Sequence, residues 1–433
     1  MYSEYLLKDG HFSLRSPALG GELDTNKILG MQNAEEIKGL GETAVSTLIN
    51  VLQDKNTLFW KWCLAAKTLG EMGPIALKAV PFLKDGLVDD RFEHAALGLS
   101  GIDPNDPELT TIIPKLIGHL GRGGERSLYQ ASASAEALRR INPPGEAFIE
   151  LTQRIESAGV HVPLLGFEIL PVKSVGFADK IYMRSLAFDL GHIGPQTLPA
   201  LIALITAGHP HSVYSSEEDT QAVYYMLKKY PLEAVGLMVE TYWALKAKGQ
   251  SLQEARFAQA LENIGRPEAL PVLIDILKHS QEYHGEESAY WAIRGIKLVD
   301  EAVRILRNDL KNDDPTVRRD SAKALGYLGN EAVEATTDLI TLLTDDWDVA
   351  LKASSALDKM GAPKAEDIHT LINFLKHENE YIRVGAANAL GKMGPLASQA
   401  IPALKHALKS VKYDEPEVKY AITEALERVE EKR

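Results

Sequence analysis

Apolar residues recur along most of the chain at the spacing of an amphipathic helix. In the segments AVPFLKDGL, TLPALIALI, ALPVLIDIL and AIPALKHAL they fall at i, i+3, i+4 and i+7, which is one face of an α-helix. A second helical pattern, rich in alanine, follows each of these segments along the chain. No stretch shows the sustained alternation of apolar and polar residues that is typical of a strand. The pattern predicts an all-α protein built from helix pairs, called helix A and helix B below.

The B helix of each pair ends in a recurring short phrase. The phrase reads LGEMGP at 69, LGHIGP at 190, LGYLG at 325 and LGKMGP at 390, with weaker copies between them. Its glycine can take the left-handed conformation that ends a helix, and a following proline cannot continue one. The copies recur roughly every 35 residues, a period typical of repeat proteins. The sequence therefore predicts an α-solenoid of about eleven helix-pair repeats.

Two stretches carry a resemblance to a known family. DDPTVRRDSAKALGYLGNEAV at 313–333 and HENEYIRVGAANALGKMGPLASQAIPALKHAL at 377–408 resemble the short bacterial-type HEAT repeats first noted in phycobilisome lyases. The consensus arginine of helix B is present as Arg318 and Arg383, whereas Trp62 stands at that position in the first repeat. The resemblance implies a right-handed, HEAT/armadillo-like superhelix whose B helices line the inner, concave curve.

Breaks in the repeat suggest how the chain is organised. Residues 1–33 lack the repeat and are expected to form an N-terminal extension or partial cap, with the solenoid over 34–433. The longest interruptions are expected to be A–B loops at 159–180, 207–219 and 278–288. Turns of this class share one edge of a solenoid, so the loops could decorate a binding edge. The alternative is neutral sequence drift in surface loops, which tolerate insertions without a binding role.

Composition and charge argue against several classes of function. The 433 residues include 47 Lys+Arg and 60 Asp+Glu, for a net charge of −13, which argues against general nucleic-acid binding. The single cysteine, Cys63, excludes a disulfide within the chain and a multi-cysteine zinc site. The sequence shows neither a secretory signal pattern nor an apolar run long enough to span a bilayer. We therefore expect a cytoplasmic protein without membrane contact.

Candidate chemistry along the chain is sparse. His209, His211, His279 and His284 lie in two expected loops and could bind a metal, but solvated loop side chains are the simpler interpretation. Deoxyhypusine hydroxylase, a HEAT-repeat enzyme, needs several His-Glu pairs at helix starts, and this chain has one, at His377. The glycine-rich stretch GRGGERS matches no phosphate-binding motif. The sequence predicts no metal site, no cofactor and no catalytic residues.

Counting back from each repeated phrase assigns residues to the exposed face of helix B. This face is rich in Tyr, Trp and Arg, the residue types enriched at protein interfaces. Acidic residues are assigned to it as well: Glu93, Glu136, Asp189, Glu218, Asp320 and Asp348. The densest predicted partner-binding group is Tyr225, Arg256, Tyr290, Trp291 and Arg294. Packing of these aromatic residues between neighbouring B helices is the alternative.

A solenoid with a mixed, aromatic inner face predicts a non-enzymatic protein–protein interaction scaffold. The expected partner is another protein, bound on the concave face and the decorated edge, and its identity is not encoded in these features. The alternative is a regulatory or substrate-positioning subunit or domain of an enzyme, either lyase-like or fused to a catalytic domain.

Overall fold

The computed structural model describes residues 29, 38–39, 41–121, 125–158, 186–206, 217–250, 252–280, 284–413 and 415–431. The chain divides into two compact units, Met1–Glu233 and Ala234–Arg433. Apart from residue 29, the predicted N-terminal extension 1–33 lies outside the described residues, as do the predicted loop 159–180 and residues 207–216 of the next loop.

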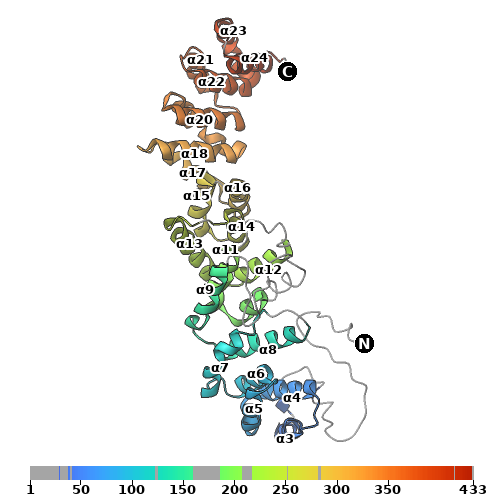
Figure 1. The fold of residues 1–433 in the computed structure, drawn as a ribbon. Coiled ribbons are helices and arrows are strands. Elements are labelled where there is room, and N and C mark those ends of the chain that lie inside the picture. Colours follow the sequence, from blue (N-terminus) through green and yellow to red (C-terminus); the bar gives the residue numbers. More distant parts are fainter. Residues whose placement is uncertain are drawn as a thin grey trace. The chain divides into compact units, whose positions relative to one another are not determined.

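Both units consist of consecutive helix pairs (Figure 1). The A helices of the first unit are α3 (Gly41–Gln53), α5 (Val80–Asp85), α7 (Pro107–Ile117), α9 (Ile149–Ala158) and α11 (Leu198–Thr206). Its B helices are α4 (Phe59–Met72), α6 (Phe92–Ile102), α8 (Glu125–Ile141), the helical residues 186–193, and α12 (Glu217–Lys228).

The second unit repeats the arrangement. Its A helices are α13 (Pro231–Ala247), α15 (Leu270–His279), α17 (Val299–Asp309), α19 (Thr336–Thr341), α21 (Ile368–Phe374) and α23 (Ile401–Ser410). Its B helices are α14 (Glu254–Ile264), α16 (Gly285–Gly295), α18 (Pro315–Leu328), α20 (Trp347–Lys359), α22 (Glu380–Met393) and α24 (Pro416–Glu430). The described residues contain no strand, and the predicted all-α solenoid of helix pairs is confirmed.

Short 3₁₀ segments lead into many of the A helices. They are η1 (Gly73–Ala79), η3 (Gly145–Phe148), η4 (Pro195–Thr197), η5 (Pro267–Ala269), η6 (Gly329–Ala335), η8 (Ala365–Asp367) and η9 (Gly394–Ala400). Two others, η2 (Gly86–Val88) and η7 (Leu342–Thr344), follow α5 and α19. The 3₁₀ form is common at the ends of α-helices and in connectors, so these segments extend each A helix without changing the repeat.

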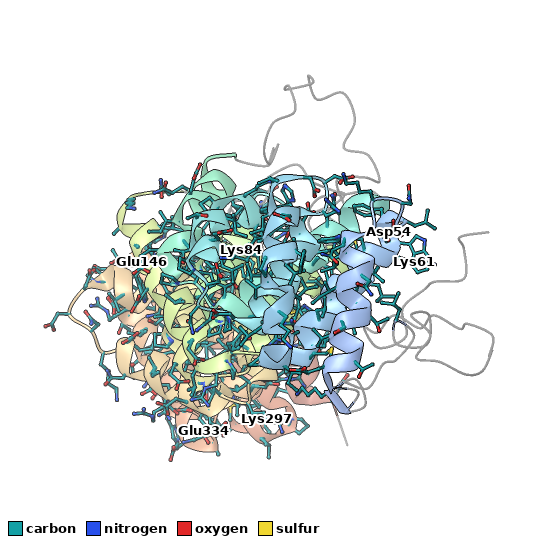
Figure 2. All side chains as sticks on the ribbon, turned by 90° about the horizontal axis from the view of Figure 1, so that it is seen from below. Asp54, Lys61, Lys84, Glu146, Lys297 and Glu334 are labelled. Atoms are coloured by element: carbon teal, nitrogen blue, oxygen red, sulfur yellow. The ribbon has the colours of Figure 1, made fainter. Side chains whose placement is uncertain are left out.

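The core of each unit lies between successive B helices and the A helices that cover them. In the first unit α6 packs between α4 and α8, and in the second α18, α20, α22 and α24 pack in succession. The leading leucine of the repeated phrase is fully buried at Leu69, Leu325 and Leu390. Charged side chains such as Lys297 and Glu334 lie at the rim of the second unit (Figure 2). A helix pair cannot bury its apolar stripe alone, and stacking provides that cover.

The two glycines of the repeated phrase have different roles. A Cβ on Gly326 would lie 3.1 Å from Ala356 Cα, so this glycine marks the closest approach of α18 and α20. Gly329, three residues later, ends α18 with a positive φ of 56°, which glycine adopts more easily than other residues. The phrase therefore encodes a helix contact and a helix stop within four residues.

Where the consensus arginine is present, at Arg318 and Arg383, it ties the A–B turn to an acidic residue of the next repeat. Arg318 donates from Nη1 to the carbonyl oxygens of Asn312 and Asp313, and from Nε and Nη2 to the Asp345 carboxylate at 2.7 and 2.6 Å. In the first repeat Trp62 replaces it and donates from Nε1 to the carbonyl oxygen of Leu52, at the end of α3. At this position, Arg318 therefore binds backbone carbonyls of the A–B turn, and Trp62 binds one at the end of helix A.

Two loop predictions need correction in the described part of the chain. The interval predicted as a loop at 278–288 is helical at both ends, because α15 continues to His279 and α16 begins at Gly285. The predicted loop 207–219 likewise ends early, since α12 begins at Glu217. Polar residues misled the prediction: Lys278 looks like loop sequence, yet its Nζ pairs with Asp309 Oδ2 at 2.5 Å and holds the last turn of α15 in place.

Two further observations bear on the sequence-based expectations. Cys63 is buried in α4, and burial raises the pKa of its thiol to about 12, which suits a packed, unreactive side chain. Among the described residues, no helix combines the length and the apolar character needed to cross a membrane.

Candidate protein-binding face

Three residues of α16 form a contact cluster on the exposed side of the helix. The Tyr290 and Trp291 rings meet edge to face with their centroids 5.1 Å apart. The guanidinium of Arg294 lies 5.4 Å from the centre of the Trp291 ring, and its Nη1 donates to the Tyr290 hydroxyl at 3.3 Å. We call Tyr290, Trp291 and Arg294 the α16 cluster.

The sequence of α16 dictates which side chains reach solvent. Ala289, Ala292 and Ile293 are fully buried and form the stripe that packs into the repeat. Because of the helical period, the three side chains of the α16 cluster point away from that stripe. Trp291 is 49% exposed, and the Arg294 side chain is 50% exposed. An aromatic ring that is left half exposed and held by its neighbours loses little side-chain entropy when another surface covers it.

The five predicted residues do not all lie in this cluster. Arg256 is half-buried on α14, the helix that packs against α16. Tyr225 belongs to the first unit, where its ring is 67% exposed on α12. The structure thus brings together Tyr290, Trp291 and Arg294.

Charges around the α16 cluster are mixed. Arg294 Nε lies 3.3 Å from Glu331 Oε1, and Lys323 Nζ lies 3.0 Å from Glu286 Oε1. The ion pair between Lys323 and Glu286 links α18 to the first turn of α16. A surface with both signs of charge suits a protein partner better than a run of phosphates.

Three acidic residues assigned to the exposed face are buried instead. Glu93 is 2% exposed, because His119 from the neighbouring repeat covers it and places Nδ1 2.5 Å from Glu93 Oε1. Burial favours a raised pKa for Glu93, but the His119 side chain, a backbone hydrogen bond and the nearby His94 together outweigh burial and lower the pKa. Asp320 and Asp189 are each 9% exposed. Burial raises the pKa of Asp189 to about 7, although the Gly121 amide donates to its carboxylate.

The histidines considered as metal ligands have protein partners. His279 places Nδ1 2.9 Å from Asp275 Oδ1 and Nε2 3.4 Å from Asp320 Oδ2, so it bridges α15 to α18. His284 places Nδ1 2.9 Å from Glu287 Oε2. No group of three or more metal-binding side chains occurs within the described ranges. His209 and His211 lie outside them.

Two exposed aromatic residues of the second unit lie outside the face that was predicted from sequence. Trp347, the first residue of α20, is 56% exposed and meets the Tyr381 ring of α22 edge to face at 5.8 Å. Tyr327 near the end of α18 is also exposed. Each B helix from α16 to α22 therefore presents an aromatic ring, although the rings occupy different positions in their helices. Listing aromatic residues by B helix, rather than by fixed offset from the phrase, would have found Trp347 and Tyr327.

The comparisons with known proteins agree with the repeat. Residues 336–427 match the model of HEAT repeats, and residues 255–279 match the PBS lyase HEAT-like repeat. No curated protein sequence matches the chain.

Solved structures give only distant likenesses. An engineered protein aligns at 20% identity over 90% of this chain and 99% of its own, with a TM-score of 0.31. The Kap95:Nup1 complex aligns at 13% identity over 94% of this chain and 59% of that chain, with a TM-score of 0.33. A designed armadillo repeat protein in complex with the peptide (KR)4 aligns at 21% identity over 49% and 95%, with a TM-score of 0.30. Scores this low add no argument to the fold seen in the helices themselves.

Proposed function

We propose that this chain, a HEAT-repeat protein, is a non-enzymatic scaffold that binds another protein through the exposed face of its B helices. The α16 cluster is the observation that carries the proposal. It combines Trp, Tyr and Arg, the three residue types most enriched where single side chains dominate binding energy. The proposed cytoplasmic location stays a prediction.

The packing of the cluster supports binding over a purely internal role. Side chains that packed between B helices would be largely buried, as Leu325 is, whereas Trp291 and Arg294 are half exposed. The apolar ring area of Trp291 is therefore available for burial by a partner, which stabilises a complex by roughly 25 cal/mol for each Å² removed from water. Arg294 remains close to the ring and can add a charged hydrogen bond.

Paired alanine variants test the proposal. A partner would be captured from native cells on the immobilised wild-type protein, identified and purified, and its affinity measured by calorimetry. Trp291→Ala and Arg294→Ala should each weaken binding by about 2 kcal/mol, because truncation removes a central contact. The melting temperature should barely change, since both side chains are half exposed.

The A helices provide a matched control of the same residue types. Trp243 on α13 is 41% exposed, and the Arg304 side chain on α17 is 72% exposed. Trp243→Ala and Arg304→Ala should leave the affinity within about twofold. If they weaken binding as much as the α16 variants do, or if the α16 variants lose stability without a separate binding defect, the B-helix face is not the binding face.

A further inference from the structure

The last three B helices carry a basic residue at the same place. Lys359, Lys392 and Arg428 are each the thirteenth residue counted from the start of α20, α22 and α24. The thirteenth residue of the preceding helix, α18, is Tyr327. We call Tyr327, Lys359, Lys392 and Arg428 the basic row. Because α18, α20, α22 and α24 pack in succession, the row runs across four neighbouring helices.

Contacts and a pocket show that members of the row lie close together. Lys359 Nζ lies 5.0 Å from the centre of the Tyr327 ring, so the first two members touch across two helices. Lys392 and Arg428 line one pocket, together with Gly361, Gly394 and Asn330. A cation at a helix end also suits the helix dipole.

The row contains charge that the protein does not neutralise. Arg428 pairs with Glu424 at 2.5 Å, and Glu431 also lines the pocket. Within the described ranges, no carboxylate forms an ion pair with Lys359 or Lys392, whereas Arg318, Lys323 and Arg383 are all paired. Among the described residues, two adjacent repeats thus present cations that no carboxylate pairs with, in a chain whose net charge is −13.

We infer that the basic row binds an extended acidic segment of a protein partner, with acidic side chains three residues apart. Packed helices lie about 8–10 Å apart. One turn of an extended polyproline II chain takes three residues and spans about 9 Å, so every third side chain points to the same side. One acidic residue in every three would therefore meet successive members of the row. The inference rests on the proposed function and adds the chemistry of the partner.

The opposite ends of the same helices argue for a peptide over a nucleic acid. The side chains of Asp346 and Asp348, 69% and 53% exposed, lie at the start of α20, and the exposed Glu417 lies at the start of α24. Eleven residues of helix, from the second to the thirteenth, separate these carboxylates from the row by roughly 16 Å. A duplex broad enough to cover both ends would set its phosphates against carboxylates, whereas one extended strand can follow the row alone.

Labelled peptides test the inference on the full chain. Fluorescence anisotropy at low ionic strength would compare four repeats of Glu-Ser-Ser with a peptide of the same composition whose four glutamates are consecutive. The spaced peptide should bind at least threefold more tightly. Lys359→Glu/Lys392→Glu should weaken its binding at least tenfold, and Lys359→Gln/Lys392→Gln serves if the first variant does not fold.

A control variant with the same change in net charge distinguishes a contact with the basic row from the general electrostatic effect of the protein's charge. Lys376 and Lys409 are exposed near the ends of α21 and α23, which are A helices. Lys376→Glu/Lys409→Glu should change the affinity less than twofold. Equal losses in the two double variants, equal binding of the two peptides, or tighter row-dependent binding of single-stranded RNA would each overturn the inference. If the peptide result fails while Trp291→Ala still weakens the native partner, the proposed function stands without the acidic segment.

Discussion

Replacing Gly98 with alanine should lower the free energy of unfolding of the first unit by about 2–3 kcal/mol. A Cβ at this position of α6 would lie 2.6 Å from the carbonyl oxygen of Ala66 in α4, and 3.1 Å from Leu83 Cδ2. Backbone atoms cannot rotate away as a flexible side chain can, so the two helices must separate. The gain of about 1 kcal/mol from the higher helix propensity of alanine does not offset this strain. Urea denaturation followed by circular dichroism would measure the change.

A glycine-to-alanine substitution at a position with open space should raise the stability of the protein instead of lowering it. Gly236 lies inside α13, and a Cβ there would meet no atom within 4 Å. Gly236→Ala should therefore stabilise the second unit by about 0.5–1 kcal/mol, through helix propensity alone. If Gly98→Ala were also stabilising, α4 and α6 would not pack as closely as the structure describes.

Removing the consensus arginine should cost about 3 kcal/mol. Arg318→Ala leaves the Asp345 carboxylate, whose side chain is 16% exposed, without its bidentate partner. It also removes the donor to the carbonyl oxygens of Asn312 and Asp313. Arg304→Ala is the matched control, because Arg304 is 72% exposed and pairs within its own helix with Glu301. The control should cost less than about 0.5 kcal/mol.

The effect of Arg318→Ala should also depend on pH. The hydrogen bond from Arg318 lowers the pKa of Asp345 below its ordinary value. The stability from this pair is therefore present above the unfolded pKa of about 3.9 and is lost as pH falls through the folded pKa. The difference in stability between wild type and variant should be largest at neutral pH and should fall in acid to the part that comes from the two carbonyl hydrogen bonds. Equal differences in stability at pH 7 and at pH 2.5 would contradict the assigned pairing.

The fold could be predicted from sequence because it depends on local, repeated signals. Leu325, Gly326 and Gly329 specify a buried residue, a helix contact and a helix end within five positions, and the phrase recurs often enough to be recognised. The position of the consensus arginine could be predicted too. Its replacement by Trp62 looked like the loss of a hydrogen-bond donor to the backbone. The residue type alone does not show that the indole N–H reaches a backbone carbonyl oxygen in its place.

The candidate site was only partly predictable, because exposure depends on the neighbouring repeat. Counting along α6 placed Glu93 on the open face, but His119 lies over it from 26 positions further along the chain. Helix periodicity identifies which side chains point away from the core of their own repeat. It does not reveal which side chains of the next repeat cover them. It located Trp291 and Arg294 on α16 because the following repeat leaves them half exposed.

Oxidative footprinting with and without the captured partner tests the central claim most directly. Trp291 on α16 and Trp243 on α13 are 49% and 41% exposed, so hydroxyl radicals should modify both rings in the free protein at comparable rates. If the B-helix face binds the partner, oxidation of Trp291 should fall several-fold in the complex while that of Trp243 stays unchanged. Protection of Trp243 with no change at Trp291 would place the partner on the A helices and contradict the proposed function.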